Sequence, residues 1–350
     1  MTAAVTERDD DGSDRTKTAA VRSAMTTGEV SCVLVTWIGF DVAGATTGAR
    51  LRDAGLSVRL APKVGAREPE EVAALAEDAV AAIVSTDPFD RGVFEATPHL
   101  RVIARVGVGT DSIDLDAATE AGVVVTTTPG ANRETAADHA LAMMLAAIRR
   151  IVEHDQSVRR GEWRRGGALT PWMLHGKTVG LVGYGEIGRA VARRLEGFEV
   201  ELLICDPAAS GPRLVELETL LARADVVSLH LPLTDGTRQL VGAAELRRMS
   251  PKAVLVNTSR GGLIDEAALV AALRSGRLRA AALDVFADEP AVPSALAELP
   301  NVVLTPHIGG LSEHSIAAMT EQATSHVLAV LAGHPERAAV ANPDVLGAVR

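Results

Sequence analysis

Three residues with chemically useful side chains lie at or just beyond the ends of apolar runs in the second half of the sequence. Arg260 follows the run AVLVNTS, Glu289 comes shortly after AAALDVF, and His307 ends NVVLTPH. Short runs of this kind are typical of buried strands in a parallel sheet. Ligands of open parallel sheets bind beyond the carboxyl ends of the strands. We therefore expect the three side chains to converge on one crevice.

An arginine, a carboxylate and an imidazole at one crevice suit the reduction of a 2-keto acid. The guanidinium of Arg260 can hold a carboxylate through paired hydrogen bonds and polarise the adjacent carbonyl. The imidazolium of His307 can give a proton to the carbonyl oxygen, while Glu289 orients the ring and favours its charged form. Taken singly, each residue also has an ordinary structural explanation, as a loop Arg, a surface Glu and a strand-end His.

The segment KTVGLVGYGEIGRAVARRLEGF contains the spacing G-x-G-x-x-G at Gly183, Gly185 and Gly188. It follows a predicted strand and opens a predicted helix, so its amides and the helix N-terminus would face an anion such as a pyrophosphate. An ordinary strand–helix turn is the alternative, because such turns also use glycine. The context favours a dinucleotide-binding loop.

Asp206 ends the next predicted strand, close to the spacing of about 20 residues after the last glycine that dinucleotide-binding folds use. A carboxylate there accepts hydrogen bonds from the adenosine ribose and repels a 2′-phosphate. We therefore expect NAD as the cofactor. Arg213, further along the same loop, leaves NADP as the less favoured alternative.

Strand-like runs alternate with helix-like segments from residue 31 onward, which predicts an α/β fold. Before the glycine loop, strands are expected over CVLVTWI, AAIVST, RVIARVG and GVVVTTTP, with helices over EPEEVAALAEDA and DLDAATEAG. From the loop onward, strands are expected over TVGLVG, EVELLICD, ADVVSLHLP and the three runs named first. The front part therefore forms a small α/β domain without a glycine-rich phosphate loop.

A long helix is predicted between these two parts, because apolar residues recur there at helical spacing. Asn132 is expected to cap this helix, and Asp265 to cap the helix that follows Arg260. A final amphipathic helix is expected over SIAAMTEQATSHVLAVLAG. The apolar face of the long helix comprises Ala137, Leu141, Met144, Leu145, Ile148, Ile151 and Val152.

Composition excludes several classes of function. The chain has 350 residues, which suggests two domains, and its 47% of hydrophobic residues provide a large core. The formal net charge of −10 argues against nucleic-acid binding, since such proteins concentrate Lys and Arg. The histidines form no pattern of metal ligands, so no metal is expected.

Three features predict a cytoplasmic protein. Cys32 and Cys205 lie in apolar runs and are expected to be reduced core thiols. The longest apolar helical stretch, HALAMMLAAI, is too short to span a membrane. Residues 1–30 are polar and acidic, lack the apolar core of a signal peptide, and are predicted to form a disordered extension.

From about Val33 onward the chain resembles the D-isomer-specific 2-hydroxyacid dehydrogenases, the family of D-3-phosphoglycerate dehydrogenase and the glyoxylate and hydroxypyruvate reductases. The matching motifs are ARVGVGTDSIDLDAA, TTPGANRETAADHALAMML, GKTVGLVGYGEIGRAVA, VVSLHLPLTDGTRQLVG, LVNTSRGGLIDEAALVAAL, AALDVFADEP and LTPHIGG. The resemblance implies an NAD-dependent enzyme that interconverts a 2-keto acid and a D-2-hydroxy acid. Its catalytic residues would be Arg260, Glu289 and His307.

The resemblance also implies binding residues. The substrate contacts would be Arg105, Val106, Gly107 and Arg260, with the backbone of RVGVG holding the substrate carboxylate. The cofactor contacts would be Val108, Gly183, Gly185, Glu186, Ile187, Gly188, Asp206, Leu231, Thr258, Ser259, Arg260, Asp284, His307 and Gly309.

The architecture that the resemblance implies has two Rossmann-like open-sheet domains, with the NAD-binding domain inserted into a flavodoxin-like substrate-binding domain. Residues 31–128 and 312–350 would form the substrate-binding domain, and residues 129–311 the NAD-binding domain. Family members are typically homodimers joined through the long helix and the arm that follows it, so a homodimer is expected.

Two departures from the family pattern disfavour phosphoglycerate as the substrate. Phosphoglycerate dehydrogenases tend to carry a basic residue after the strand that corresponds to AAIV, whereas this sequence continues Ser85-Thr86-Asp87. Asp87 is expected to repel a phosphate, although Arg105 remains available. The chain is also expected to lack the extra regulatory domain of the longer family members.

Other polar residues have simpler explanations. His230 is expected to be buried beside the cofactor rather than catalytic, and Asp138 and His139 are expected to hydrogen-bond locally at the start of a helix. One rival function remains, that of a non-enzymatic, dinucleotide-sensing binding protein. The C-terminal-binding corepressors, which share this fold and these catalytic residues, are the model for it.

Overall fold

The computed structural model describes residues 31–63, 65–167 and 170–348, together with Val21. Apart from Val21, the predicted extension over residues 1–30 lies outside the described residues. The chain folds into two compact units. Residues 1–131 and 312–350 belong to the first unit, and residues 132–311 to the second unit.

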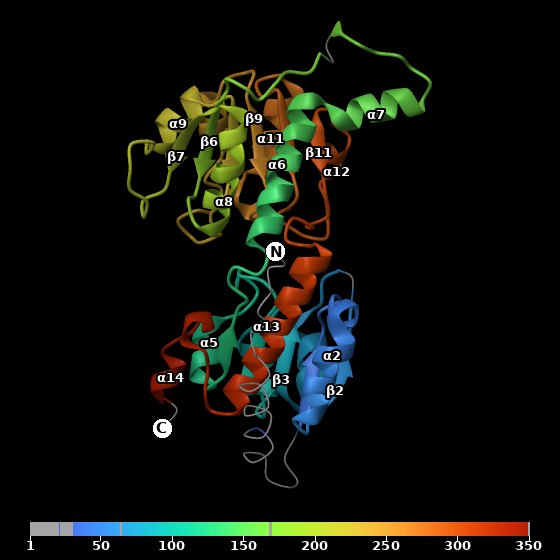
Figure 1. The fold of residues 1–350 in the computed structure, drawn as a ribbon, viewed down its shortest axis with the longest axis vertical. Coiled ribbons are helices and arrows are strands. Elements are labelled where there is room, and N and C mark those ends of the chain that lie inside the picture. The colour runs from blue at the N-terminus through green and yellow to red at the C-terminus, as the bar shows by residue number, and fades with distance from the viewer. Residues whose placement is uncertain (1–20, 22–30, 64, 168–169, 349–350) are drawn as a thin grey trace, which may run out of the picture. The chain divides into compact units, whose positions relative to one another are not determined.

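The first unit contains a five-stranded parallel sheet in the order β2-β1-β3-β4-β5 (Figure 1). The chain adds β2 on one side of β1 and then reverses to add the other strands on the opposite side, which is the flavodoxin-like order. The strands are β1 (Cys32–Val35), β2 (Ser57–Leu60), β3 (Ala79–Val84), β4 (Val102–Arg105) and β5 (Val124–Thr126). The helices are α2 (Phe40–Asp53), α3 (Pro69–Ala76), α4 (Arg91–Ala96), α5 (Leu115–Glu120), α13 (Glu313–Leu331) and α14 (Val345–Ala348).

Helix α13 returns to the first unit after the chain has built the second unit. It packs against α2, β3 and β4, and its colour in Figure 1 marks how far along the chain it lies. Beyond α13, Asn342 binds the edge strand β5, because its side chain accepts from the Val125 amide and donates to the Val123 carbonyl, both at 2.9 Å. Segments from the two ends of the chain therefore build one unit.

Strand β2 is the one strand of the first unit that apolar patterning does not predict. Its residues, SVRL, are exposed or half-buried, whereas β1, β3, β4 and β5 are buried along their whole length. A half-exposed edge strand lacks the continuous apolar run by which buried parallel strands are recognised.

A buried ion pair lies at the point where the strand order of the first unit reverses, between the ends of β1 and β3. The guanidinium of Arg67 bonds to the Asp87 carboxylate at 2.6 Å, and the two side chains are only 5% and 6% exposed. The second oxygen of Asp87 accepts from the Thr36 hydroxyl at 2.6 Å. Asp87 was expected to repel a phosphate through its negative charge. That reason is wrong, because Arg67 neutralises the charge.

The second unit contains a six-stranded parallel sheet in the order β11-β10-β9-β8-β6-β7. Its strand order reverses between β6 and β8, so the second unit repeats the topology of the first with one strand more. The strands are β6 (Thr178–Val182), β7 (Glu201–Cys205), β8 (Val226–Leu229), β9 (Val254–Asn257), β10 (Ala280–Leu283) and β11 (Val302–Leu304). The helices are α6 (Arg133–Arg149), α7 (Ile151–Arg159), α8 (Glu186–Leu195), α9 (Leu217–Arg223), α10 (Ala243–Arg248), α11 (Glu266–Arg274) and α12 (Ser294–Ala297).

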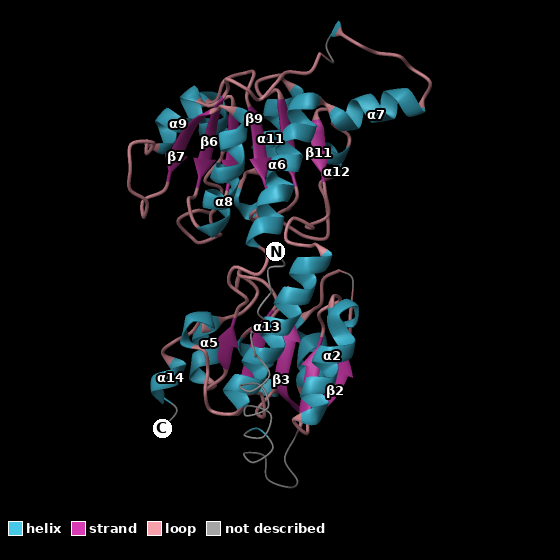
Figure 2. Cartoon of the chain, viewed as in Figure 1, coloured by secondary structure: helices cyan, strands magenta, loops and turns pink. Residues whose placement is uncertain are grey.

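Helices flank the strands in each unit, which confirms the predicted class of two open parallel-sheet α/β domains (Figure 2). In the second unit, alternate residues of the strands enter two apolar clusters. Leu181 of β6 joins one cluster with α6 and α8, while Val182 joins the other with α9 and α11. Because both faces of the sheet are buried, these strands are mainly apolar.

The predicted long helix is in fact two helices, α6 and α7. Arg150 adopts the left-handed conformation, with φ 55°, and separates them. The break turns Ile151 and Val152 away from the core, where they are 55% and 36% exposed, so their assignment to the apolar face is wrong. Asn132 is the N-cap residue of α6, as predicted, but its side chain makes no capping hydrogen bond.

The Arg67–Asp87 pair predicts a specific loss of stability. We expect Arg67→Met to lower the free energy of unfolding by about 3–5 kcal/mol, because it leaves the Asp87 carboxylate buried without its partner. The matched control is Arg59→Met, which breaks an exposed pair with Asp78 and should cost less than about 1 kcal/mol. Urea denaturation measures both changes, and hydrogen exchange of the β1 and β3 amides assigns them to the first unit.

Equal losses in the two variants would contradict this prediction. Such a result would mean that the buried Arg67–Asp87 pair contributes no more to the free energy of unfolding than an exposed pair does.

Candidate active site

His307 and Glu289 form a direct hydrogen-bonded pair beyond the ends of β11 and β10. Nδ1 of His307 lies 2.6 Å from Oε2 of Glu289, and the side chains are 35% and 30% exposed. The other oxygen of Glu289 accepts from the Phe286 amide at 3.0 Å. Glu289 is thus fixed at one oxygen and bonds the imidazole with the other, which leaves Nε2 of His307 as the nitrogen that can meet a ligand.

The backbone around His307 is held in an uncommon conformation by Asp284. His307 has φ 52°, in the left-handed region that few residues other than glycine adopt. Its amide donates to the Asp284 carbonyl at 2.8 Å. The next two amides, of Ile308 and Gly309, donate to the Asp284 carboxylate at 2.9 and 2.8 Å. Three consecutive amides therefore bond to one residue at the end of β10.

Asp284 is fully buried, and its own pKa reflects these contacts. Burial opposes ionisation of the carboxyl, but the hydrogen bonds from His139, Thr305 and the amides of Ile308 and Gly309 outweigh it and lower the pKa of Asp284. The carboxylate predicted to contact the cofactor thus has four donors within the second unit, and its cofactor contact stays a prediction.

Arg260 lies between β9 and a 3-10 turn, η3 (Gly261–Leu263). Its Nη1 donates to the Ser259 carbonyl at 2.7 Å, and its own carbonyl accepts from the Asn257 side chain at 2.8 Å. A Cβ on Gly261 would lie 1.9 Å from the carbonyl carbon of Phe286, so this loop contacts the loop that leads to Glu289. The structure thereby brings together the loops that carry Arg260, Glu289 and His307.

Glu266 supports the Glu289 loop from the first turn of α11, although sequence reasoning did not single it out. Asp265 caps this helix as predicted, by accepting from the Ala268 amide at 3.0 Å. Glu266 accepts from the Ala287 amide at 2.9 Å. Burial raises the pKa of Glu266, the bond from Ala287 opposes this, and the neighbouring charges of Asp288 and Glu289 raise it further.

The glycine loop between β6 and α8 fits a dinucleotide in three distinct ways. Gly183 has φ 95°, and a Cβ there would lie 2.3 Å from the His230 carbonyl oxygen. A Cβ on Gly188 would lie 2.4 Å from the Gly183 carbonyl oxygen, so α8 packs on the strand end only without a side chain. A Cβ on Gly185 would meet no atom within 4 Å of the described chain, which leaves its backbone open to a ligand. Tight turn, close helix packing and open approach are the roles that pyrophosphate binding assigns to these positions.

Asp206 lies beside the glycine loop, at the end of β7. One carboxylate oxygen accepts from the Tyr184 amide at 2.6 Å and the other from the Ala208 amide at 2.8 Å. The structure therefore places a negative charge next to the loop, at the position predicted to face the adenosine ribose.

The remaining predicted cofactor residues of the second unit lie along the same edge of its sheet. The hydroxyl of Thr258, at the end of β9, is buried and has no hydrogen-bond partner among the described residues, so it can bond a bound group. Ser259 is already engaged, because its hydroxyl donates to the Leu229 carbonyl at 2.6 Å. Leu231 follows β8 and is half-buried, while Glu186 and Ile187 begin α8.

The first unit carries the other predicted residues, at the end of β4 and in the loop that follows it. Arg105 is buried and donates to the Val106 carbonyl at 2.7 Å. The Val106 amide bonds to the Val84 carbonyl at 2.7 Å, and the Gly107 amide to the Thr128 hydroxyl at 2.8 Å. Both amides predicted to hold a substrate carboxylate thus have partners within the first unit, whereas Val108 is exposed.

His230 is buried at the end of β8, as predicted. Its Nε2 lies 2.9 Å from the Ser228 hydroxyl, and burial lowers the pKa of His230 from 6.5 to about 4. The imidazole is therefore neutral near pH 7, which argues against a role as proton donor.

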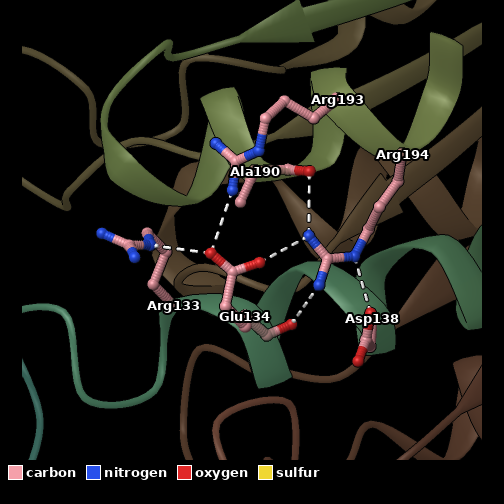
Figure 3. A network of polar contacts seen from close by, with 6 residues as sticks. All are labelled: Arg133, Glu134, Asp138, Ala190, Arg193 and Arg194. Carbon is pink, nitrogen blue, oxygen red and sulfur yellow. Dashed lines mark hydrogen bonds and ion pairs between the residues drawn. The ribbon is translucent and has the colours of Figure 1, made fainter. Parts of the chain in front are cut away.

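Asp138 and His139 bond to distant segments, so the prediction of local hydrogen bonds is wrong. Asp138 accepts from Nε of Arg194 on α8 at 2.6 Å, within a network that also joins Glu134 to Arg193 and Arg194 (Figure 3). His139 instead contacts Thr305 and Asp284, beyond the ends of β11 and β10. Only the folded topology brings these segments together, and no local spacing signals it.

The described residues contain neither a cluster of metal-binding side chains nor a membrane-spanning helix. They contain no group of three or more His, Cys, Asp or Glu side chains arranged to hold a metal ion. None of their helices combines the length and the apolar character needed to cross a membrane.

A parallel sheet with a glycine loop at its switch point and a His–Glu pair beyond neighbouring strands defines the class of dinucleotide-dependent oxidoreductases. Residues 141–309 match the family model of the D-isomer specific 2-hydroxyacid dehydrogenase NAD binding domain. The glyoxylate reductase of Korarchaeum cryptofilum is 45% identical over 261 residues, which cover 71% of this chain and 78% of that protein. The chain therefore belongs to the D-isomer-specific 2-hydroxyacid dehydrogenases, a family of oxidoreductases.

Two further relatives show the range of this family. The D-3-phosphoglycerate dehydrogenase of Mycobacterium leprae is 44% identical over 267 residues, which cover 74% of this chain but 50% of that protein. The NADPH-dependent glyoxylate/hydroxypyruvate reductase of Sinorhizobium meliloti, solved with NADP and malonate, has a TM-score of 0.76 and 33% identity. The match covers 86% of this chain and 93% of that one. Family membership therefore leaves open the choice of substrate and of NAD or NADP.

The burial of His230 predicts how stability depends on pH. The unfolded state takes up a proton near pH 6.5 and the folded state only near pH 4, so this contribution is complete above pH 6.5 and is lost as the pH falls towards 4. We expect the free energy of unfolding of the wild type to fall by on the order of 3 kcal/mol between pH 6.5 and pH 4 because of His230 alone. His230→Gln should remove that part of the slope in urea denaturation.

The exposed His175 supplies the control, since His175→Gln should leave the slope unchanged. A slope that is the same in the wild type and in His230→Gln would show that His230 takes up its proton equally in the folded and unfolded states.

Proposed function

We propose that this protein reduces a small 2-keto acid to the D-2-hydroxy acid, or runs the reverse reaction, with NAD as its cofactor. The observation that carries the proposal is the 2.6 Å contact between His307 and Glu289, next to the loop that presents Arg260. A proton donor, the group that orients it and a guanidinium all lie beyond neighbouring strands of one sheet.

Each of the three residues has a defined task in this reaction. Arg260 binds the substrate carboxylate and polarises the adjacent carbonyl. When bound, NADH supplies the hydride that the carbonyl carbon accepts. His307 gives the proton from Nε2 to the carbonyl oxygen, so keto acid, hydride and proton together yield the hydroxy acid. Glu289 orients the ring through Nδ1 and stabilises its charged form.

The preference for NAD rests on Asp206. Its carboxylate lies beside the glycine loop, where a ribose hydroxyl can donate to it and a 2′-phosphate would be repelled. Arg213 is exposed on the following loop and is the residue through which an NADP preference would arise. The charge of Asp206 therefore decides between the two cofactors.

We propose a substrate without a phosphate group. At the switch point of the first unit, Arg67 is bound to Asp87 and buried with it, so its charge is already neutralised. Arg105 is also buried and donates to the backbone. Neither guanidinium is presented on the surface of the first unit, where a phosphate would need it. Glyoxylate and hydroxypyruvate, the substrates in the name of the Sinorhizobium meliloti relative, fit this requirement.

We further propose that the chain forms a homodimer through α7 and the segment after it. Ile151 and Val158 on α7 are 55% and 58% exposed, and Trp163 and Met173 beyond it are 79% and 60% exposed. Large apolar side chains at this density on one stretch are typical of a surface that a second copy covers.

A cytoplasmic location is also proposed, on the state of the cysteines. Both are free thiols, although Cys205 is half-buried where a core position was expected. Burial and the charges of Glu216 and Asp206 raise the pKa of Cys205, which keeps the thiol protonated and unreactive.

Substitution of the proposed catalytic residues tests the function. We expect NADH oxidation with glyoxylate or hydroxypyruvate, and His307→Ala should lower kcat by at least about 100-fold through loss of the proton donor. Arg260→Ala should raise KM for the keto acid as well as lower kcat. His175→Ala and Arg274→Ala, at exposed positions of the second unit, are the controls and should leave both constants unchanged.

A protein that binds NADH tightly but reduces none of glyoxylate, hydroxypyruvate, phenylpyruvate, oxaloacetate or phosphohydroxypyruvate would overturn the enzymatic proposal. That outcome would favour the dinucleotide-sensing alternative.

Cofactor choice is tested by Asp206→Asn, which removes the charge but keeps the shape of the side chain. We expect kcat/KM with NADH to exceed that with NADPH in the wild type, and the ratio to narrow by about tenfold in the variant, the effect of one charge-assisted hydrogen bond. Steady-state rates with both cofactors measure the ratio. A wild type that turns over faster with NADPH would contradict the role given to Asp206.

A further inference from the structure

His139 on α6 contacts polar side chains just beyond the ends of β10 and β11. Its Nε2 lies 3.1 Å from the Thr305 hydroxyl oxygen and 3.3 Å from Oδ1 of Asp284. The Thr305 hydroxyl itself donates to Oδ1 of Asp284 at 2.6 Å. The Asp284 carboxylate can only accept, so the favourable arrangement places a hydrogen on Nε2 of His139.

The group that His139 contacts also determines the backbone of His307. Asp284 binds three consecutive amides of the turn, those of His307, Ile308 and Gly309. A left-handed conformation at a residue that is not glycine is strained and needs such support. The carboxylate of Asp284 therefore fixes the two residues that follow His307, and its main-chain carbonyl fixes the amide of His307 itself.

Asp284, His139 and the backbone at Gly309 are packed tightly against one another. A Cβ at Gly309 would lie 2.7 Å from Oδ2 of Asp284 and 3.3 Å from Cδ2 of His139. Backbone, carboxylate and imidazole are packed against one another, so His139 limits the movement of Asp284 from the side of α6.

Helix α6 presents His139 from a fixed position. The residue before it, Asp138, bonds to Arg194 of α8, and Glu134 one turn earlier bonds to Arg193 and Arg194 (Figure 3). Adjacent residues of α6 thus bond in two directions, one to α8 and one to the end of β10.

We propose that His139 is a positioning residue for His307, and that it acts through Thr305 and Asp284. By donating from Nε2, it holds the Asp284 carboxylate where that group can bind the amides of Ile308 and Gly309. This inference rests on the proposed function, in which His307 is the proton donor. It adds a residue from a different helix to the set that determines the geometry of the reaction.

The first readout is independent of activity. We expect His139→Leu to speed amide hydrogen exchange at Ile308 and Gly309 by about 10- to 100-fold, the effect of losing a hydrogen bond to a charged group. His139→Gln keeps a donor nitrogen in reach of the carboxylate and should restore most of the protection. The control Asp138→Asn weakens only the bond to Arg194 and should leave these amides unchanged.

The second readout separates positioning from a merely structural role. In His139→Leu we expect kcat to fall about tenfold, from the misplaced proton donor, while KM for the keto acid changes less than threefold. Thr305→Val removes the bridging hydroxyl with little change of shape, so it should act in the same way even if the leucine variant folds poorly. The double variant, His139→Leu with Thr305→Val, should have a kcat no lower than that of the poorer single variant, because both substitutions act on the carboxylate of Asp284.

Unchanged exchange at Ile308 and Gly309 in His139→Leu would overturn the proposal. The proposal would also fail if the loss of kcat in His139→Leu tracked a fall in melting temperature and His139→Gln did not restore kcat. If the wild type reduces no 2-keto acid, the proposed function fails, but the exchange measurement still decides whether His139 positions the turn at His307.

Discussion

The buried carboxylate of Asp284 is the contact on which the geometry of the candidate site depends. Burial alone would favour the neutral acid, but His139, Thr305 and two backbone amides donate to it and lower its pKa. The ionised carboxylate then holds the amides of the following turn in a conformation that the chain would otherwise avoid. His307 lies at the start of this turn and reaches Glu289 only from there. A buried charge normally destabilises the folded state. Here the hydrogen-bond donors around Asp284 stabilise the charge, and the charged group in turn positions the residues of the site.

Close approach of backbones is the second requirement of this site. The turn after Arg260 passes the Phe286 backbone at a distance that no side chain at Gly261 would allow. The start of α8 meets the end of β6 in the same way, through Gly183 and Gly188. Parallel strands bring their carboxyl ends to one edge, but these glycines bring the loops themselves into contact. The arrangement of the site therefore depends on glycines, which have no side chain, as much as on the residues with reactive side chains.

Much of this architecture can be predicted from the sequence, because buried parallel strands are continuous apolar runs and the polar residues that follow them share one edge. The break between α6 and α7 cannot, since Arg150 adopts a left-handed conformation without being glycine. The partners of His139 and of Arg67 cannot be predicted either. Thr305 and Asp87 lie far from them along the chain, and only the order of the strands decides which segments meet. Sequence patterns therefore predict the candidate residues better than the contacts that hold them.

The two units share one topology but differ at the point where their strand order reverses. In the first unit this point is closed by a buried pair, Arg67 with Asp87, and both charges are satisfied within the unit. In the second unit it is bordered by the glycine loop between β6 and α8, where a Cβ on Gly185 would meet no atom of the described chain within 4 Å. An open glycine backbone can approach a ligand closely, whereas a buried ion pair offers neither of its charges to one. The residues at the switch point, and not the topology that the two units share, therefore associate the dinucleotide with the second unit.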